Sequence, residues 1–241
     1  MSGQITIEVL FGEFANLFGD LLNVKYLQQC LPEARVVHTA LGERPAFADG
    51  GVSLVYMGGM TEGQQELAID ALRPYRADLE RHIDAGGAGL FTGNALELLE
   101  SHIENEDGSR IEALGLFPTH ARRQMMNRYN ALILETFEGI KVVGYKGQFS
   151  HSYGDNSDCA CFDVLRGDGL QPGSAKEGLR RNNFLATYTL GPLLPTNPLF
   201  TKRLQELMGV ERPRLAFEDA AMEAYRTRLK EFEDPAVKFE Q

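Results

Sequence analysis

The feature that most constrains the fold is a series of short apolar runs that alternate with amphipathic stretches. Runs rich in β-branched residues are predicted as strands over Ile5 to Phe11, Arg35 to Leu41, Val52 to Met57 and Ala88 to Phe91. Helical periodicity follows the first run, from Leu17 to Cys30, and separates the last two runs. Strands that alternate with helices through short glycine-containing loops form a parallel sheet covered on both faces. The sequence therefore predicts an α/β fold with a mostly parallel sheet flanked by helices.

The stretch from Glu62 to Ala85 carries its own interruptions. Pro74 lies inside the helical pattern, and proline both removes a backbone donor and clashes with the preceding turn. Gly86 and Gly87 follow, where a helix commonly ends on a left-handed residue. The pattern predicts two helices divided near Pro74, the second ending at the glycine pair.

The pattern changes after Arg110. Four further strands with polar turns between them are predicted over Met125 to Phe137, Lys141 to Lys146, Ala160 to Leu165 and Phe184 to Leu190. They suggest an antiparallel or mixed extension of the same sheet. Two helices are predicted in the segment from about Asn197, with a break between them near Pro213. Because no long polar linker divides the chain, we expect one domain over residues 1–241 with a helical C-terminal segment.

Charge and cysteine content exclude several classes of function. The 24 Lys and Arg against 34 Asp and Glu give a formal net charge of −10. This balance argues against nucleic acid as a partner and against a polybasic membrane anchor. No window reaches the roughly 20 apolar residues of a bilayer span, and the N-terminus lacks a signal-peptide pattern. Three cysteines are too few and odd in number for a secreted disulfide framework, so we expect a cytoplasmic protein.

Two glycine-containing turns follow predicted strands. Met57-Gly58-Gly59-Met60 lies at the carboxyl end of its strand, where open parallel sheets bind ligands. Its adjacent glycines would let backbone N–H groups approach an anion, or would simply permit a tight turn. The second turn, Thr92-Gly93-Asn94, joins strand to helix as nucleophile elbows do. No base is evident near Thr92, and Asn94 is predicted to cap the helix, so the residues alone favour a structural turn.

Other candidate groups have simpler interpretations. Asp20 and Asn23 surround a helix start, where capping would account for both. Cys159 and Cys161 form a C-x-C pair on a predicted strand, with His151 nearby. Since the second ligand pair of a zinc site is missing, no metal site is predicted, and all three cysteines are interpreted as buried thiols. His151 is interpreted as a hydrogen-bonded surface residue, and no cofactor is predicted.

Taken in order, these segments resemble class I glutamine amidotransferases of the cobyric-acid-synthase type, in particular the glutaminase subunits of lipid II isoglutaminyl synthases. Asn16 to Asn23 is similar to the family's N-L-Y-G-D-x-x-N, and Met57-Gly58-Gly59-Met60 with Gln64 to its G-G-G-Q followed by E-Q. Thr187-Tyr188, Gly191 to Leu194 and Asn197-Pro198 resemble its T-Y-x-H-G-P-x-L and N-P. The order and spacing hold over residues 5 to 208.

The resemblance implies glutamine hydrolysis by a cysteine thiolate, with a histidine moving protons, backbone N–H groups holding the oxyanion, and ammonia passing to a synthetase. This sequence departs from the family at the reacting groups. The family nucleophile falls on Gly93, or on Thr92 with a one-residue slip, and the histidine before G-P falls on Leu190. A second family histidine, in the loop G-F-E-N-H, is also absent from Gly144 to Gln148.

Three hypotheses follow from the resemblance. The first is an amidotransferase-fold protein without conventional glutaminase activity, whose pocket (Gly58, Gly59, Thr92, Gly93, Asn94, Asp20 and Asn23) binds glutamine or a related small molecule, or docks a Mur-ligase-like synthetase subunit. The second is an active glutaminase that supplies ammonia to amidate the lipid II peptide stem or a corrinoid, which requires Cys159 or Cys161 to reach the elbow. The third is a purely structural or regulatory subunit.

Overall fold

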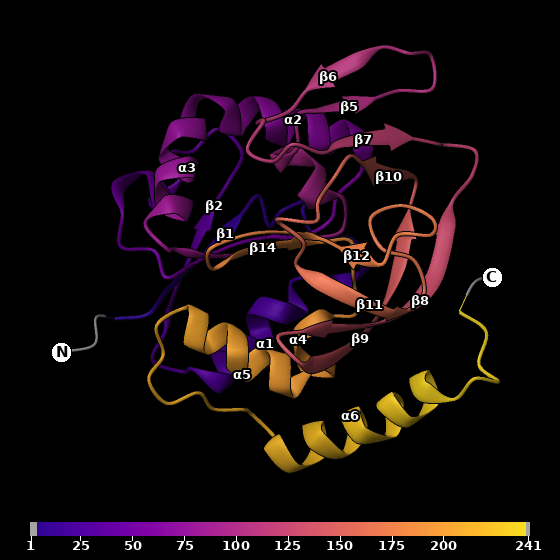
Figure 1. The fold of residues 1–241 in the computed structure, drawn as a ribbon. Coiled ribbons are helices and arrows are strands. Elements are labelled where there is room, and N and C mark those ends of the chain that lie inside the picture. Colours follow the sequence, from indigo (N-terminus) through magenta and orange to yellow (C-terminus); the bar gives the residue numbers. More distant parts are fainter. Residues whose placement is uncertain (1–3, 240–241) are drawn as a thin grey trace.

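The computed structural model describes residues 4–239 and is built around a six-stranded sheet of order β13-β14-β4-β3-β1-β2 (Figure 1). Its strands are β1 (Thr6–Leu10), β2 (Arg35–Thr39), β3 (Leu54–Met57), β4 (Ala88–Thr92), β13 (Leu179–Arg181) and β14 (Phe184–Thr187). All neighbours pair in parallel except β13, which is antiparallel to β14. The predicted mostly parallel sheet is confirmed. The register pairs Met57 with Phe91 and Thr92 with Thr187, so β3, β4 and β14 end at one edge.

Helices cover both faces of this sheet (Figure 1). On one face lie α2 (Glu62–Leu72), η3 (Arg73–Tyr75) and α3 (Arg76–Asp84). On the other face lie α1 (Leu22–Cys30), α4 (Leu193–Thr196) and α5 (Pro198–Leu207). The short 3-10 helices are η1 (Leu17–Gly19), η2 (Ala46–Asp49) and η4 (Gly93–Leu99).

The predicted helix interruptions are confirmed, with differences in detail. Pro74 lies in η3, which separates α2 from α3. Gly86 then takes a φ of +82°, a left-handed value at the end of α3. The single helix expected over Leu17 to Cys30 is divided into η1 and α1, because Phe18 takes a positive φ of 60° that no α-helix accommodates.

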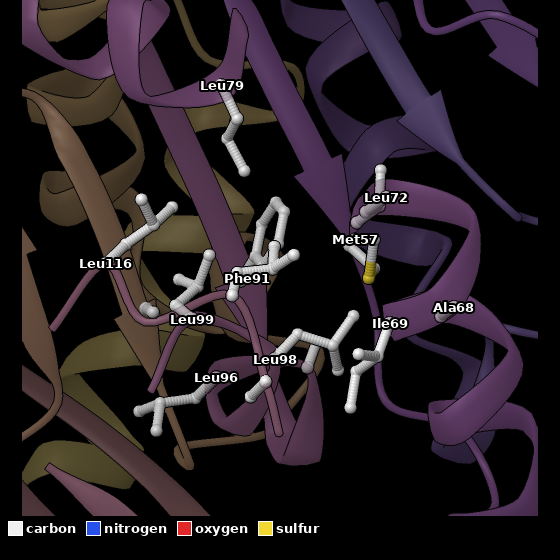
Figure 2. Close-up of a cluster of buried hydrophobic side chains, with 14 of the residues drawn as sticks. Met57, Ala68, Ile69, Leu72, Leu79, Phe91, Leu96, Leu98, Leu99 and Leu116 are labelled. Atoms are coloured by element: carbon white, nitrogen blue, oxygen red, sulfur yellow. The ribbon is translucent and has the colours of Figure 1, made fainter. Parts of the chain in front are cut away.

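One large apolar cluster lies between the sheet and α2, α3 and η4. Figure 2 shows Ile69 of α2 and Leu98 of η4 in this cluster, together with Phe91 of β4. Fully burying a side chain of this size stabilises a fold by about 1.5–3 kcal/mol. A second cluster fills the opposite face of the sheet, where residues of α1 and α5 pack. The turn after β4 is therefore fixed to the core, because Leu96, Leu98 and Leu99 of η4 pack in this apolar cluster.

Residues 102 to 177 form two additional four-stranded sheets, so of the later strands only β13 and β14 belong to the main sheet. This corrects the expectation that all later strands extend that sheet. The first additional sheet contains β5 (His102–Glu104), β6 (Arg110–Glu112), β7 (His120–Arg123) and β10 (Ser150–Tyr153). The second contains β8 (Tyr129–Phe137), β9 (Ile140–Gln148), β11 (Phe162–Arg166) and β12 (Lys176–Glu177). A bridge between Tyr145 and Leu190 joins β9 to the segment after β14.

The C-terminal segment is helical twice, as expected, in α5 and α6 (Glu218–Glu233). Helix α6 lies along the outside of the second additional sheet (Figure 1). Tyr225 fixes it there, since its hydroxyl donates a 2.7 Å hydrogen bond to the carbonyl of Lys141. Within the described chain, no helix combines the length and apolar character that crossing a bilayer needs.

Candidate functional site

The two glycine turns lie side by side at the carboxyl ends of β3 and β4. Asn94 joins them, because its Nδ2 donates to the carbonyl of Met60 at 2.8 Å and its Oδ1 accepts from the Met60 N–H at 3.0 Å. The prediction that Asn94 caps the following helix is therefore wrong. The Asn94 side chain joins the turn after β4 to the turn after β3 and makes no capping hydrogen bond in its own helix, so η4 has no side-chain cap.

Gly93 begins η4 in a conformation that suits glycine. Its φ is +62°, and a Cβ at this position would lie 3.3 Å from Gly59 Cα and 3.4 Å from Leu190 Cδ2. A side chain at residue 93 would therefore face Leu190 across the pocket. The two residues that meet here are a glycine without a side chain and a leucine without a proton to transfer.

The glycine turn after β3 is tight for a steric reason. A Cβ on Gly58 would lie 2.5 Å from the carbonyl oxygen of Ala15 and 3.0 Å from Asp20 Cβ. The turn is also hydrogen-bonded to the same loop, since Leu17 N–H donates to the Gly59 carbonyl at 3.0 Å. Close approach of the loop over residues 11–20 thus accounts for Gly58 without any ligand.

Asp20 is buried beside both turns. Its Oδ2 accepts hydrogen bonds from the Thr92 hydroxyl at 2.6 Å and from the Gly59 N–H at 3.3 Å. Its Oδ1 is buried without a hydrogen-bond partner among the described residues. Burial raises the pKa of Asp20 to about 6, and the hydrogen bonds from Thr92 and Gly59 partly oppose this shift. The expected capping role for Asp20 is wrong, because its carboxylate binds β4 and the glycine turn.

Thr92 and Asn23 also have interior roles. The Thr92 side chain is fully buried and donates to Asp20, so it does not face the pocket. Asn23 lies within α1, where its Nδ2 donates to the Tyr56 hydroxyl at 3.1 Å and its Oδ1 accepts from Leu194 N–H at 2.8 Å. The predicted capping role of Asn23 is therefore wrong too, and the residue connects α1 to β3 and α4.

A pocket of about 300 Å³ opens over Gly93. Its walls are Leu17, Phe18, Gly59, Met60, Thr61, Glu62, Gly93, Asn94, Arg128, Gly147, Gln148, Phe149, Ser150 and Leu190. Of the seven residues predicted for the site, it includes Gly59, Gly93 and Asn94, whereas Gly58, Asp20, Asn23 and Thr92 lie behind it. No cysteine or histidine lines it in the described part of the chain.

Several pocket residues were not among the predicted site residues. Arg128 stands over the rings of Phe18 at 5.6 Å and Phe149 at 5.5 Å. Gln148 and Ser150 come from the ends of β9 and β10. The local sequence around Arg128, Gln148 and Ser150 did not indicate that these residues would line a pocket.

The cysteines lie elsewhere. Cys159 and Cys161 are in a turn before β11, not on a strand, and they pack against different apolar clusters. Cys30 and Cys161 are buried, as predicted, and Cys159 is half-buried. Burial raises the pKa of both the Cys159 and the Cys161 thiol, which disfavours the nucleophilic thiolate. The C-x-C pair therefore supplies no group to the pocket.

Two further observations concern a metal site. His151 is only 7% exposed and lies edge-on to Tyr129, with ring centroids 5.0 Å apart, so its interpretation as a surface residue is wrong. The described residues contain no cluster of three or more histidine, cysteine, aspartate or glutamate side chains that could hold a metal ion.

A buried polar network supports the turn from below. It consists of Gln65, Glu97, Arg123, Ser150 and Tyr188, and is called the Glu97 network here. The Glu97 carboxylate accepts from Gln65 Nε2 at 2.8 Å, from the Tyr188 hydroxyl at 3.0 Å and from the Ser150 hydroxyl. Burial raises the pKa of Glu97, while these donors and Arg123 oppose the shift. The network connects α2, η4, β7, β10 and the end of β14 beneath the pocket.

Comparison with known proteins agrees with this architecture. Residues 6–198 match the CobB/CobQ-like glutamine amidotransferase domain. The chain is 25% identical over 217 residues to subunit GatD of the lipid II isoglutaminyl synthase (glutamine-hydrolyzing) of Staphylococcus aureus strain N315, covering 89% of this chain and 88% of that protein.

Solved structures with little sequence similarity share the fold. PurLQS from Thermotoga maritima aligns with a TM-score of 0.55 at 10% identity, over 94% of this chain and 99% of the other. A crystal structure of a glutamine amidotransferase aligns with a TM-score of 0.56 at 17% identity, over 85% and 99%. The α/β fold of class I glutamine amidotransferases is therefore present, and the chain belongs to the CobB/CobQ-like glutamine amidotransferase family.

Proposed function

We propose that this protein is an amidotransferase-like subunit that has lost conventional glutaminase activity and acts by binding a ligand or regulating a partner. The observation that carries the proposal is the pairing of Gly93 with Leu190 at the strand-to-helix turn, in a pocket lined by no cysteine or histidine among the described residues. Hydrolysis of a glutamine amide needs a nucleophile and a base within hydrogen-bonding reach of each other. Glycine and leucine supply neither.

The pocket nevertheless keeps features that suit glutamine or a related small molecule. Arg128 can pair with a carboxylate, and Glu62, at the start of α2, can accept from an ammonium group. The apolar side chains of Phe18, Met60 and Leu190 can enclose the methylene groups between them. We infer that binding survived the loss of the reacting groups.

We further propose that the partner is a Mur-ligase-like synthetase in the cytoplasm. The S. aureus relative is itself a subunit of a synthase. The pocket mouth carries exposed apolar side chains, Leu17 at 37% and Phe18 at 46% exposure, and such surfaces commonly mark protein contacts. A ligand bound in the pocket would lie beneath this contact and could change the affinity of the partner.

The proposal is tested by glutamate release. The purified protein is incubated with L-glutamine, alone and with a Mur-ligase-like partner that co-purifies with it, and glutamate is measured. We expect no release above the protein-free rate, and a change in partner affinity when glutamine is added. Clear enzymatic release that no substitution at Gly93 or Thr92 alters would contradict the proposal and show that the nucleophile lies elsewhere. Co-purification without any effect of glutamine would indicate a purely structural subunit.

A further inference from the structure

Gln148 lines the pocket and has a side-chain oxygen whose hydrogen-bonding capacity is unused. Gln148 ends β9 and is 6% exposed, and its Oε1 is buried without a hydrogen-bond partner. Among the described residues that line the pocket, Gln148 alone has such a buried, unpartnered polar side-chain atom. The other buried polar atoms without partners belong to residues outside the pocket lining.

The orientation of this amide is fixed by its neighbour. Gln148 Nε2 donates a 2.6 Å hydrogen bond to the carbonyl oxygen of Ser150, which can only accept. The reversed amide would place one acceptor against another, so Oε1 must be the free atom. A buried acceptor left unpaired costs free energy that a ligand N–H donor would recover.

The guanidinium of Arg128 lies nearer the protein surface than the buried Gln148 side chain. Arg128 is exposed at the mouth, and no hydrogen bond or ion pair joins its guanidinium to another residue in the range 4–239. A carboxylate bound by Arg128 would therefore lie near the surface. The opposite end of the same ligand would point toward the buried Gln148, past the apolar side chain of Leu190.

From this arrangement we propose that Gln148 is a specificity-determining residue, whose Oε1 accepts a hydrogen bond from the side-chain amide of glutamine and so selects glutamine over glutamate. Glutamate at neutral pH presents a carboxylate, which has no N–H to donate and faces the Gln148 oxygen with like partial charge. Sites built to bind a donor reject analogues that lack it, because the buried acceptor is then left unpaired. The inference rests on the proposed function, since it requires a pocket that binds glutamine without hydrolysing it.

Isothermal titration calorimetry at neutral pH tests the inference on the full chain, with L-glutamine, L-glutamate and L-methionine as ligands. Methionine has a similar length and no side-chain donor. We expect glutamine to bind about 5- to 150-fold more tightly than either of the others. Gln148→Met should remove this preference by weakening glutamine binding alone.

Gln124→Met is the matched control, because Gln124 is exposed and does not line the pocket. Thermal melting establishes that each variant is folded, and the ligand comparison on the unaltered protein stands even if Gln148→Met fails to fold. Equal affinity for glutamine and glutamate, an unchanged preference in a folded Gln148→Met, or no glutamine binding at all would overturn the inference. Glutamate release, measured in the same samples, reports separately on the proposed function.

Discussion

The wall of the pocket and the layer directly beneath it differ sharply in how their polar groups are used. At the wall, Gly93 meets Leu190, and Gln148 Oε1 has no hydrogen-bond partner among the described residues. Beneath it, the Glu97 carboxylate receives three side-chain donors. The layer beneath the turn is thus joined by hydrogen bonds through Glu97, whereas Gly93 and Leu190 at the turn carry no nucleophile or base. The proposed loss of glutaminase chemistry at the pocket wall is compatible with an intact hydrogen-bonded layer beneath it.

The largest expected effect concerns the supporting layer. Glu97→Leu would remove the acceptor of the hydrogen bonds from Gln65 Nε2, Ser150 and Tyr188, together with the carboxylate near Arg123, and breaking a buried charged network in this way typically costs about 3–5 kcal/mol. We expect the free energy of unfolding, measured with urea, to fall by that amount. The control is Glu66→Gln, since Glu66 pairs with Arg123 at 3.0 Å but has a 47% exposed side chain. Its cost should stay below about 1 kcal/mol, and similar costs for the two variants would contradict the comparison.

A second effect concerns the boundary between the two regions, where burial raises the pKa of Asp20 to about 6. A carboxyl whose folded pKa exceeds its unfolded value stabilises the fold below the unfolded pKa, and this stabilisation is lost as pH rises through the folded pKa. The change in pKa from 3.8 to about 6 corresponds to about 3 kcal/mol. The unfolding free energy of the unaltered protein should therefore fall, relative to that of Asp20→Asn, as pH rises from about 4 to about 6. If the free energies of unfolding of the two proteins changed with pH in parallel, the Asp20 carboxyl would be exposed to solvent and not buried.

A smaller effect separates the two kinds of glycine. Gly58→Ala places a Cβ 2.5 Å from the Ala15 carbonyl, and overpacking of this kind costs about 1–3 kcal/mol. Gly63→Ala, in α2 with no atom within 4 Å of the added Cβ, should instead stabilise the protein by about 0.5–1 kcal/mol. Shifts of melting temperature in opposite directions would support the steric account of Gly58. Equal shifts would mean that the loop over residues 11–20 does not press on the turn.

The sequence predicted the parts of this molecule that depend on local pattern. The parallel strands, the break at Pro74 and the placement of Gly59 and Gly93 beside one pocket all follow from periodicity and from glycine turns at strand ends. The two additional sheets did not follow, because short strands with polar turns carry no information about which strands they pair with.

The errors at individual residues share one physical cause. Asn94, Asp20 and Asn23 were each assigned to the cap of their own helix, yet their side chains bind Met60, Thr92 and Tyr56, which are 34, 72 and 33 residues away in sequence. A cap is a local interaction that a short segment can indicate, whereas these partners meet only once the sheet has formed. The unpartnered oxygen of Gln148 could not be predicted from the sequence either, because it depends on which groups surround the side chain in the folded protein.

The measurement that tests the central claim most directly is glutamate release from L-glutamine by the unaltered protein and by the double variant Gly93→Cys, Leu190→His. A thiol at residue 93 would face residue 190, because a Cβ there lies 3.4 Å from the Leu190 side chain. The account predicts no release above background from the unaltered protein and measurable release from a folded double variant. Glutamate release above background from the unaltered protein would contradict the claim that the protein has lost conventional glutaminase activity.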